Sequence, residues 1–119
     1  MRIQQRKINQ TLDTQLRKTF LQLMSDLKNP KEIDLFLKDF LTDSEYEMLT
    51  KRLAISYWLK KGRTYANIKE NLKVSSATIS SVQEITEREG IKLALKKIEA
   101  DEWAEKWEKK IKKILKNQK

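Results

Sequence analysis

The sequence predicts an all-α protein, with one small helical domain followed by a helical extension at the C-terminus. Apolar residues recur at steps of three and four along nearly the whole chain, the spacing of helices that bury one face. Only one Pro and two Gly interrupt the 119 residues, so the chain has few places at which a helix must end. We expect residues 1–101 to form the domain and residues 102–119 to form a basic amphipathic helix.

The composition argues against an enzyme. The chain has no cysteine and no histidine, which removes disulfides, thiolate metal sites, the usual metal ligand and the usual general base. We therefore expect no catalytic residue, no metal site and no cofactor. No apolar run exceeds three residues and the N-terminus lacks the apolar core of a secretory signal, so the expected location is the cytoplasm.

The net charge of +9 favours a polyanionic partner, either nucleic acid or an anionic membrane surface. The two ends of the chain carry this charge. Residues 1–30 hold six basic and two acidic residues, and residues 106–119 hold seven lysines and one glutamate. Lysine-rich helical faces are also common as solvated surface, so charge alone does not choose a partner.

The first helix carries a single apolar stripe and ends before Asn29-Pro30. The residues of this stripe are Ile8, Leu12, Leu16, Phe20, Leu23 and Leu27. A lone narrow stripe on a helix of this length has to lie on the rest of the chain or on a second copy. A homodimer is therefore expected.

Two further helices should follow. Residues 31–41 place apolar side chains at helical spacing, and Thr42 with Glu45 forms a capping box that starts a new helix. This helix should run to about Lys61 and end at Gly62 in the left-handed conformation. Its buried residues should be Leu49, Leu53 and parts of Tyr57, Trp58 and Leu59.

Residues 64–85 have the spacing of a helix-turn-helix. Thr64 can cap a helix over about 65–72 that buries Ile68 and Leu72, and Lys73-Val74 then turns the chain. Ser75 can cap a second helix. The residues that this second helix should bury are Ile79, Val82 and Ile85. Lys73 stands where such turns usually have glycine, and a positive φ there would cost about 1 kcal/mol.

Gly90 should interrupt the chain again, before a last helical segment. Its first apolar stripe consists of Ile91, Ala94, Leu95 and Ile98. After a five-residue step the stripe continues with Trp103, Trp107, Ile111, Ile114 and Leu115. The step indicates a kink or a change of packing partner.

From Phe40 to about Ile85 the chain resembles the Trp repressor superfamily. The segment FLTDSEYEMLTKR is similar to the capped helix before the family's DNA reader, and IKENL followed by ATIS is similar to its two reading helices. Arg63-Thr64-Tyr65 and the ATIS segment at 77–80 resemble the Trp repressor-related branch of the YerC/YecD type. The resemblance implies an intertwined homodimer that binds double-stranded DNA at a pseudo-palindromic operator, as a repressor-type transcriptional regulator.

The family's tryptophan pocket is matched only in part. Thr42 and Arg52 stand at pocket positions, which makes them the candidate ligand-binding residues, but Ser81 and Val82 replace the second pocket arginine and a small glycine. A ligand carboxylate would lose half of its charged partners and an indole would meet a branched side chain. We therefore do not expect a tryptophan corepressor, and Arg52 is better explained as an exposed helix arginine or as a partner of Glu45 or Glu47 than as a ligand-binding residue.

The predicted recognition helix, from Ser76 to Glu84, contains no Arg, Lys or Asn. Hydroxyl groups can nevertheless bond to phosphates and base edges, and methyl groups can touch a thymine methyl, so such a helix can read DNA weakly. Phosphate contacts are expected from Arg63, Lys69 and Lys73. The other candidate DNA-binding residues are Thr64, Tyr65, Ser75, Ser76, Ala77, Thr78, Ser80 and Ser81.

Two other functions remain open at this stage. In one, the hairpin is vestigial and the Trp103/Trp107 face docks a partner helix, as in a protein-interaction or scaffold module. In the other, residues 102–119 bind a membrane surface, with apolar residues opposite lysines. Salt dependence distinguishes DNA binding from apolar docking, because only the former falls steeply with salt. Sedimentation with liposomes tests the membrane alternative.

Overall fold

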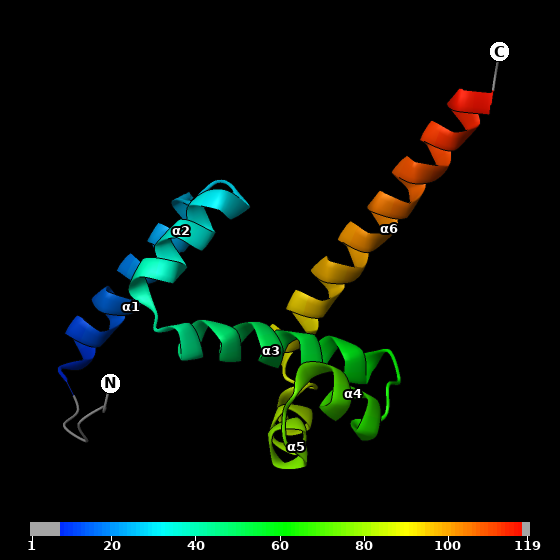
Figure 1. The fold of residues 1–119 in the computed structure, drawn as a ribbon. Helices are drawn as coiled ribbons and strands as arrows, with labels where there is room; N and C mark the ends of the chain where they lie inside the picture. The colour runs from blue at the N-terminus through cyan, green and yellow to red at the C-terminus, as the bar shows by residue number, and fades with distance from the viewer. Residues whose placement is uncertain (1–7, 118–119) are drawn as a thin grey trace. The chain divides into compact units, whose positions relative to one another are not determined.

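The computed structural model describes residues 8–117, which contain six helices and no strand (Figure 1). The helices are α1 (Gln10–Asp26), α2 (Pro30–Phe40), α3 (Asp43–Lys60), α4 (Tyr65–Leu72), α5 (Ser76–Ile85) and α6 (Glu89–Asn117). The all-α prediction is confirmed. The chain divides into two compact units, Met1–Tyr46 and Glu47–Lys119. The basic residues that precede Ile8, and Lys119, lie outside the described residues.

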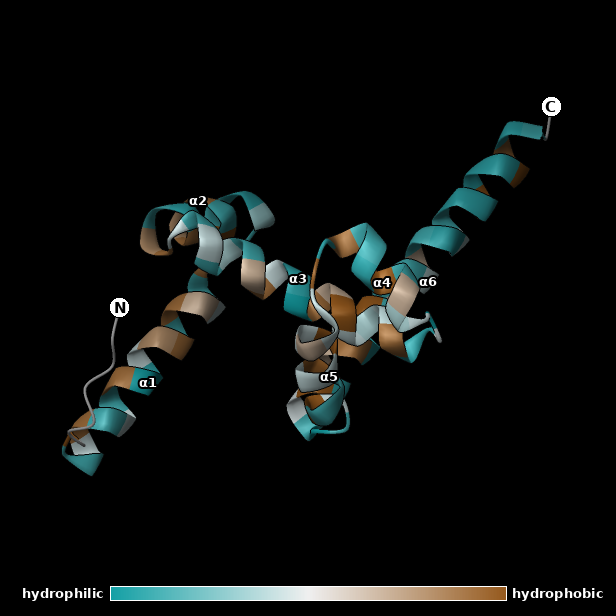
Figure 2. Cartoon of the chain, turned by 60° about the horizontal axis from the view of Figure 1, so that its bottom comes forward, coloured by the Kyte–Doolittle hydropathy of each residue, from teal (hydrophilic) through white to brown (hydrophobic). Residues whose placement is uncertain are grey.

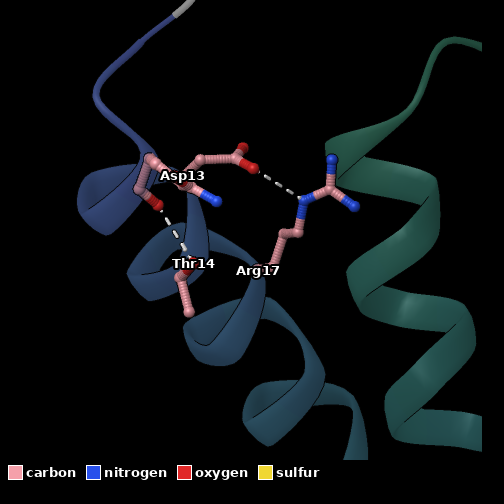
Figure 3. A network of polar contacts seen from close by, with 4 residues as sticks. Asp13, Thr14 and Arg17 are labelled. Atoms are coloured by element: carbon pink, nitrogen blue, oxygen red, sulfur yellow. Dashed lines mark hydrogen bonds and ion pairs between the residues drawn. The ribbon is translucent and has the colours of Figure 1, made fainter.

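Local side-chain bonds fix the start of α1. The Asn9 carboxamide oxygen accepts from the amide of Thr11 at 2.8 Å, so the helix begins after Asn9. Figure 3 shows two contacts in the first turns, the ion pair between Asp13 and Arg17 at 3.1 Å and the bond from the Thr14 hydroxyl to the Gln10 carbonyl at 3.0 Å. These exposed contacts contribute little individually and serve mainly to favour the helix over other local conformations.

The apolar stripe of α1 lies open in the single chain. None of the residues of α1 is buried, and Leu12, Leu16 and Phe20 are 46%, 54% and 44% exposed. Apolar and polar residues alternate along this helix in Figure 2. Ile8 precedes the helix and Leu27 follows its last turn, so the stripe on the helix itself is shorter than the sequence predicted. An apolar face of this kind needs a partner surface.

The second helix begins at Pro30 rather than at residue 31, because Asn29 caps it and Pro is tolerated at the first helical position. The rings of Phe36 and Phe40 stack with centroids 4.9 Å apart. The Tyr46 hydroxyl donates to the Asp34 carboxylate at 2.8 Å. Bonds from Lys38 and from Tyr46 lower the pKa of Asp34, which keeps this carboxyl charged at neutral pH.

The predicted capping box of α3 is confirmed. The Thr42 hydroxyl accepts from the Glu45 amide at 3.1 Å, and the Glu45 carboxylate accepts from the Thr42 amide at 2.9 Å. Gly62, with φ of +85°, stands two residues after the last residue of α3, as predicted.

The expected burial of Leu49 and Leu53 is wrong for the single chain, where these side chains are 48% and 44% exposed. Ile55 and Ser56 are the buried residues of α3 instead. The cluster that α4 and α5 form with α3 is centred on Ile55, and neither Leu49 nor Leu53 is among the residues packed against it.

The predicted break at Gly90 is wrong. Gly90 lies inside the first turn of α6, and the chain leaves helical structure at residues 86–88 instead. Two backbone hydrogen bonds between residues three apart hold this turn. The Thr86 amide donates to the Gln83 carbonyl, and the Arg88 amide donates to the Ile85 carbonyl. No helix of the described residues is long and apolar enough to cross a membrane.

The turn between α4 and α5 carries a strained residue at the predicted place. Lys73 has φ of +55° and ψ of +50°, the left-handed conformation, and its amide donates to the Lys69 carbonyl. It is the non-glycine residue with positive φ among residues 8–117. The side chain raises the energy of this conformation, because its Cβ crowds the following carbonyl oxygen.

Replacing Lys73 with glycine should relieve this crowding. We expect the free energy of unfolding to rise by up to about 1 kcal/mol, measured by urea denaturation. The matched control is Lys69→Gly inside α4, which should lower stability by about 1 kcal/mol. A stability loss of similar size in both variants would contradict strain at Lys73.

Candidate nucleic-acid interface

The helix pair α4–α5 is built by two side-chain caps. The Thr64 hydroxyl accepts from the Asn67 amide at 3.1 Å, and the Ser75 hydroxyl accepts from the Thr78 amide at 3.1 Å. Each bond satisfies an amide that the first turn of a helix leaves without a partner. Both helices therefore start where the sequence predicted, and the turn between them is short.

A small buried cluster fixes the orientation of these helices. Ile55 of α3, Ile68 of α4, and Ile79 and Val82 of α5 are buried and pack together. The partly buried side chains around them are Trp58, Leu59, Tyr65, Leu72 and Val74. Ile85, which the sequence placed in the core, is only half-buried. Because α5 turns Ile79 and Val82 inward, its hydroxyl-rich side must face outward.

The outward side of α5 carries most of the predicted reading residues. Ser76, Ala77, Ser80 and Ser81 are exposed, whereas Thr78 is half-buried. The hydroxyl groups of Thr78 and Ser75 lie 3.0 Å apart, so both belong to the cap as well as to the surface. Among the predicted contact residues, Thr64 and Ser75 therefore cap helices while remaining exposed, and Ser76, Ser80 and Ser81 are exposed on the body of α5.

Arg63 is held in place at the start of α4. Its guanidinium lies over the Trp58 ring at 3.9 Å from the ring centroid, and it donates to the Asn67 side chain at 3.3 Å. Its backbone amide donates to the Trp58 carbonyl at 3.0 Å. Stacking on an aromatic ring leaves the N–H edges of a guanidinium available to an anion. The sequence did not single out Trp58 or Asn67 for this role, although Asn67 stands four residues after Arg63, a spacing at which helical side chains meet.

The remaining candidates lie on the same two helices and their turn. Lys69 and Lys73 are exposed. Tyr65 is half-buried, and its hydroxyl donates to the Gln83 carboxamide of α5. Tyr65 therefore links α4 to α5 and is a structural residue in the single chain. Among the described residues, no group of three acidic side chains is placed to hold a metal ion.

Arg52 of α3 lines an open hollow of about 420 Å³ beside α5. Its other lining residues are Met48, Thr78, Ser81, Val82 and Ile85. The hollow therefore brings Arg52 next to the two residues that the sequence identified as departures from the tryptophan pocket. Thr42 belongs to the other compact unit.

The fold and the exposed side of α4–α5 define a helix-turn-helix protein. Residues 15–98 match the family described as Trp repressor protein, and the chain belongs to this family. Members of this family are non-enzymatic DNA-binding regulators, so the prediction that the chain is not an enzyme is confirmed. The matched residues end inside α6, so the last turns of that helix extend beyond them. A comparison with curated proteins gave no match.

Because Ser81 and Val82 line the hollow next to Arg52, we expect no binding of L-tryptophan. Isothermal titration of tryptophan should give no heat of binding, and tryptophan should not change DNA affinity. The control variant is Ser81→Arg, which supplies a second cation for a carboxylate. Saturable binding of tryptophan to the unaltered protein would contradict this expectation.

Proposed function

We propose that this protein is a sequence-specific, DNA-binding transcriptional regulator of the YerC/YecD type, which reads a pseudo-palindromic operator as a homodimer. The observation that carries the proposal is the outward side of α5, which bears exposed serines, on a helix pair whose first helix begins next to the stacked guanidinium of Arg63. A role on DNA agrees with the cytoplasmic location expected from the sequence.

In this arrangement α5 would contact bases in a groove, and α4 with its flanking residues would contact phosphates. Ser76 and Ser80 stand four residues apart on the exposed side of α5, so both can face one groove. Arg63, Lys69 and Lys73 are exposed cations on α4 and its flanks, which suits phosphates on either side of a groove. Thr64 and Ser75 cap α4 and α5 and so hold the two helices that would contact DNA. Ala77 and Ser81 are exposed and could contact DNA directly.

Hydroxyl contacts alone give modest discrimination. A bidentate pair between an arginine and a guanine gives about 1–3 kcal/mol per base, and α5 offers no such side chain from Ser76 to Glu84. Two copies of the reader on one operator compensate, because their contacts add within a single complex. The proposal therefore needs the dimer.

The test of reading is the variant Ser76→Ala/Ser80→Ala. Affinity for an operator chosen from a random DNA pool should fall by about 1–3 kcal/mol, whereas affinity for a scrambled duplex and the salt slope should hardly change. Fluorescence anisotropy at two salt concentrations measures both. The matched control is Ser25→Ala/Ser44→Ala, which removes two exposed hydroxyls outside α5 and should leave both affinities unchanged.

Full operator preference in the Ser76/Ser80 variant would exclude α5 as the reader. Binding that does not weaken with salt would instead favour the protein-interaction alternative, because phosphate contacts release counterions.

The test of the dimer is the variant Leu16→Asp/Phe20→Asp. Carboxylates buried in a subunit interface cost several kcal/mol, so the variant should lose the dimer and unfold or aggregate in sedimentation measurements. The matched control is Thr14→Asp/Ser25→Asp, on the opposite side of α1, which should keep the wild-type mass. A well-folded monomer from the Leu16/Phe20 variant would rule out an intertwined dimer.

A further inference from the structure

The last part of α6 lies beyond the residues that match the family, and we call residues 99–117 the C-terminal extension. Its first turn is attached to α3. The Lys60 ammonium lies 3.4 Å from the Glu99 carboxylate, and the Tyr57 hydroxyl donates to the Glu102 carboxylate. This bond to Glu102 is the main cause of the raised pKa of Tyr57. From Trp103 to the end of the described residues every side chain is exposed.

An apolar stripe runs along this exposed helix. Its members are Trp103, Trp107, Ile111, Ile114 and Leu115, which are between 46% and 64% exposed. The two tryptophan rings lie side by side, with centroids 5.6 Å apart. A helix segment of this length is marginally stable in water on its own. A continuous exposed apolar stripe marks a surface that binds another molecule.

The apolar residues are placed so that two copies of the segment, running antiparallel, bring tryptophans opposite aliphatic side chains. Trp107 and Ile111 stand on either side of a point near Lys109, and Trp103 and Leu115 stand on either side of them at equal spacing. When two copies run antiparallel about this point, each tryptophan faces an aliphatic side chain. Ala104, Trp107, Ile111 and Ile114 are spaced by three, four and three residues, the alternation that packs two helices together.

Ile114 and the neighbouring Ala104 also fit the antiparallel register. In the same antiparallel register Ile114 of one copy faces Ala104 of the other, so a large side chain meets a small one. A parallel register would instead place Trp107 against Trp107 and leave Ala104 against Ala104. The antiparallel register therefore fills space more evenly along the seam.

Charge favours the same direction. Between Glu99 and Glu105 the helix has four acidic residues and no basic one, whereas residues 106–117 have six lysines and one glutamate. An antiparallel pair brings the acidic end of each copy beside the basic end of the other, and a parallel pair brings like ends together. This attraction is modest and falls with salt, because the charges are exposed.

From these features we propose that the C-terminal extension pairs with the same segment of a second copy of this chain, antiparallel, with Trp107 of one copy against Ile111 of the other. DNA would satisfy the lysines but leave the apolar stripe in water, and an anionic membrane would repel the acidic first turns of the extension. The proposal does not rest on DNA binding.

Cysteine cross-linking tests it cleanly, since the chain has no cysteine of its own. The full-length variant Ala104→Cys/Ile114→Cys leaves both tryptophans and Ile111 in place. The two cysteines stand ten residues apart on one helix, about 15 Å, too far to join within a chain. Under mild oxidation most of this variant should run as a covalent dimer on a non-reducing gel and return to monomer with reductant.

The single variants Ala104→Cys and Ile114→Cys are the matched controls. Antiparallel pairing places each lone cysteine opposite Ile114 or Ala104, so neither should cross-link efficiently. Efficient cross-linking of the single variants would show parallel pairing and overturn the proposal. Absence of cross-linking in all three variants would overturn self-pairing altogether, and sedimentation of the full chain with phosphatidylglycerol vesicles would then identify lipid as the occupant.

These outcomes are separate from those for the proposed function. Operator preference and its loss in the serine variant report on α5, and the Leu16/Phe20 variant reports on α1. The cross-links report only on residues 99–117.

Discussion

The buried cluster of Ile55, Ile68, Ile79 and Val82 is the constraint on which the reading helices depend. Burying branched aliphatic side chains of this size contributes roughly 1.5–3 kcal/mol each. Neither α4 nor α5 is long enough to be stable alone, with eight and ten residues. The cluster therefore both holds the two helices on α3 and decides which of their sides meets solvent.

The features that the sequence predicted correctly are local ones. The caps at Thr42, Thr64 and Ser75 join residues three positions apart, and the positive φ of Lys73 follows from the shortness of the turn. Such interactions are decided by residue types at fixed offsets, so a single sequence contains the information. The same reasoning predicted the capped helix pair and the burial of its apolar side.

The incorrect or missed sequence predictions concern how helices and side chains that are distant along the chain pack on one another. Leu49 and Leu53 have the spacing of core residues, yet they are exposed and are not among the residues packed against the buried cluster. Arg63 stacks on Trp58 across the turn at Gly62, and no pattern of residue types predicts a contact across that turn. Gly90 favours a break because glycine is a poor helix former, but α5 ends at Ile85 and Gly90 lies inside the first turn of α6. The proposed DNA contacts and the subunit pairing stay predictions.

The stacking of Arg63 on Trp58 has a thermodynamic consequence. A free arginine side chain gives up as much as about 2 kcal/mol of rotamer entropy when it is immobilised. For Arg63 part of that loss already occurs when the chain folds, because the ring and the Asn67 side chain restrict the guanidinium. An anion that meets Arg63 therefore orders less of the protein than one that meets a solvated lysine such as Lys69. The two kinds of contact should differ in the temperature dependence of their strength even where their charges are equal.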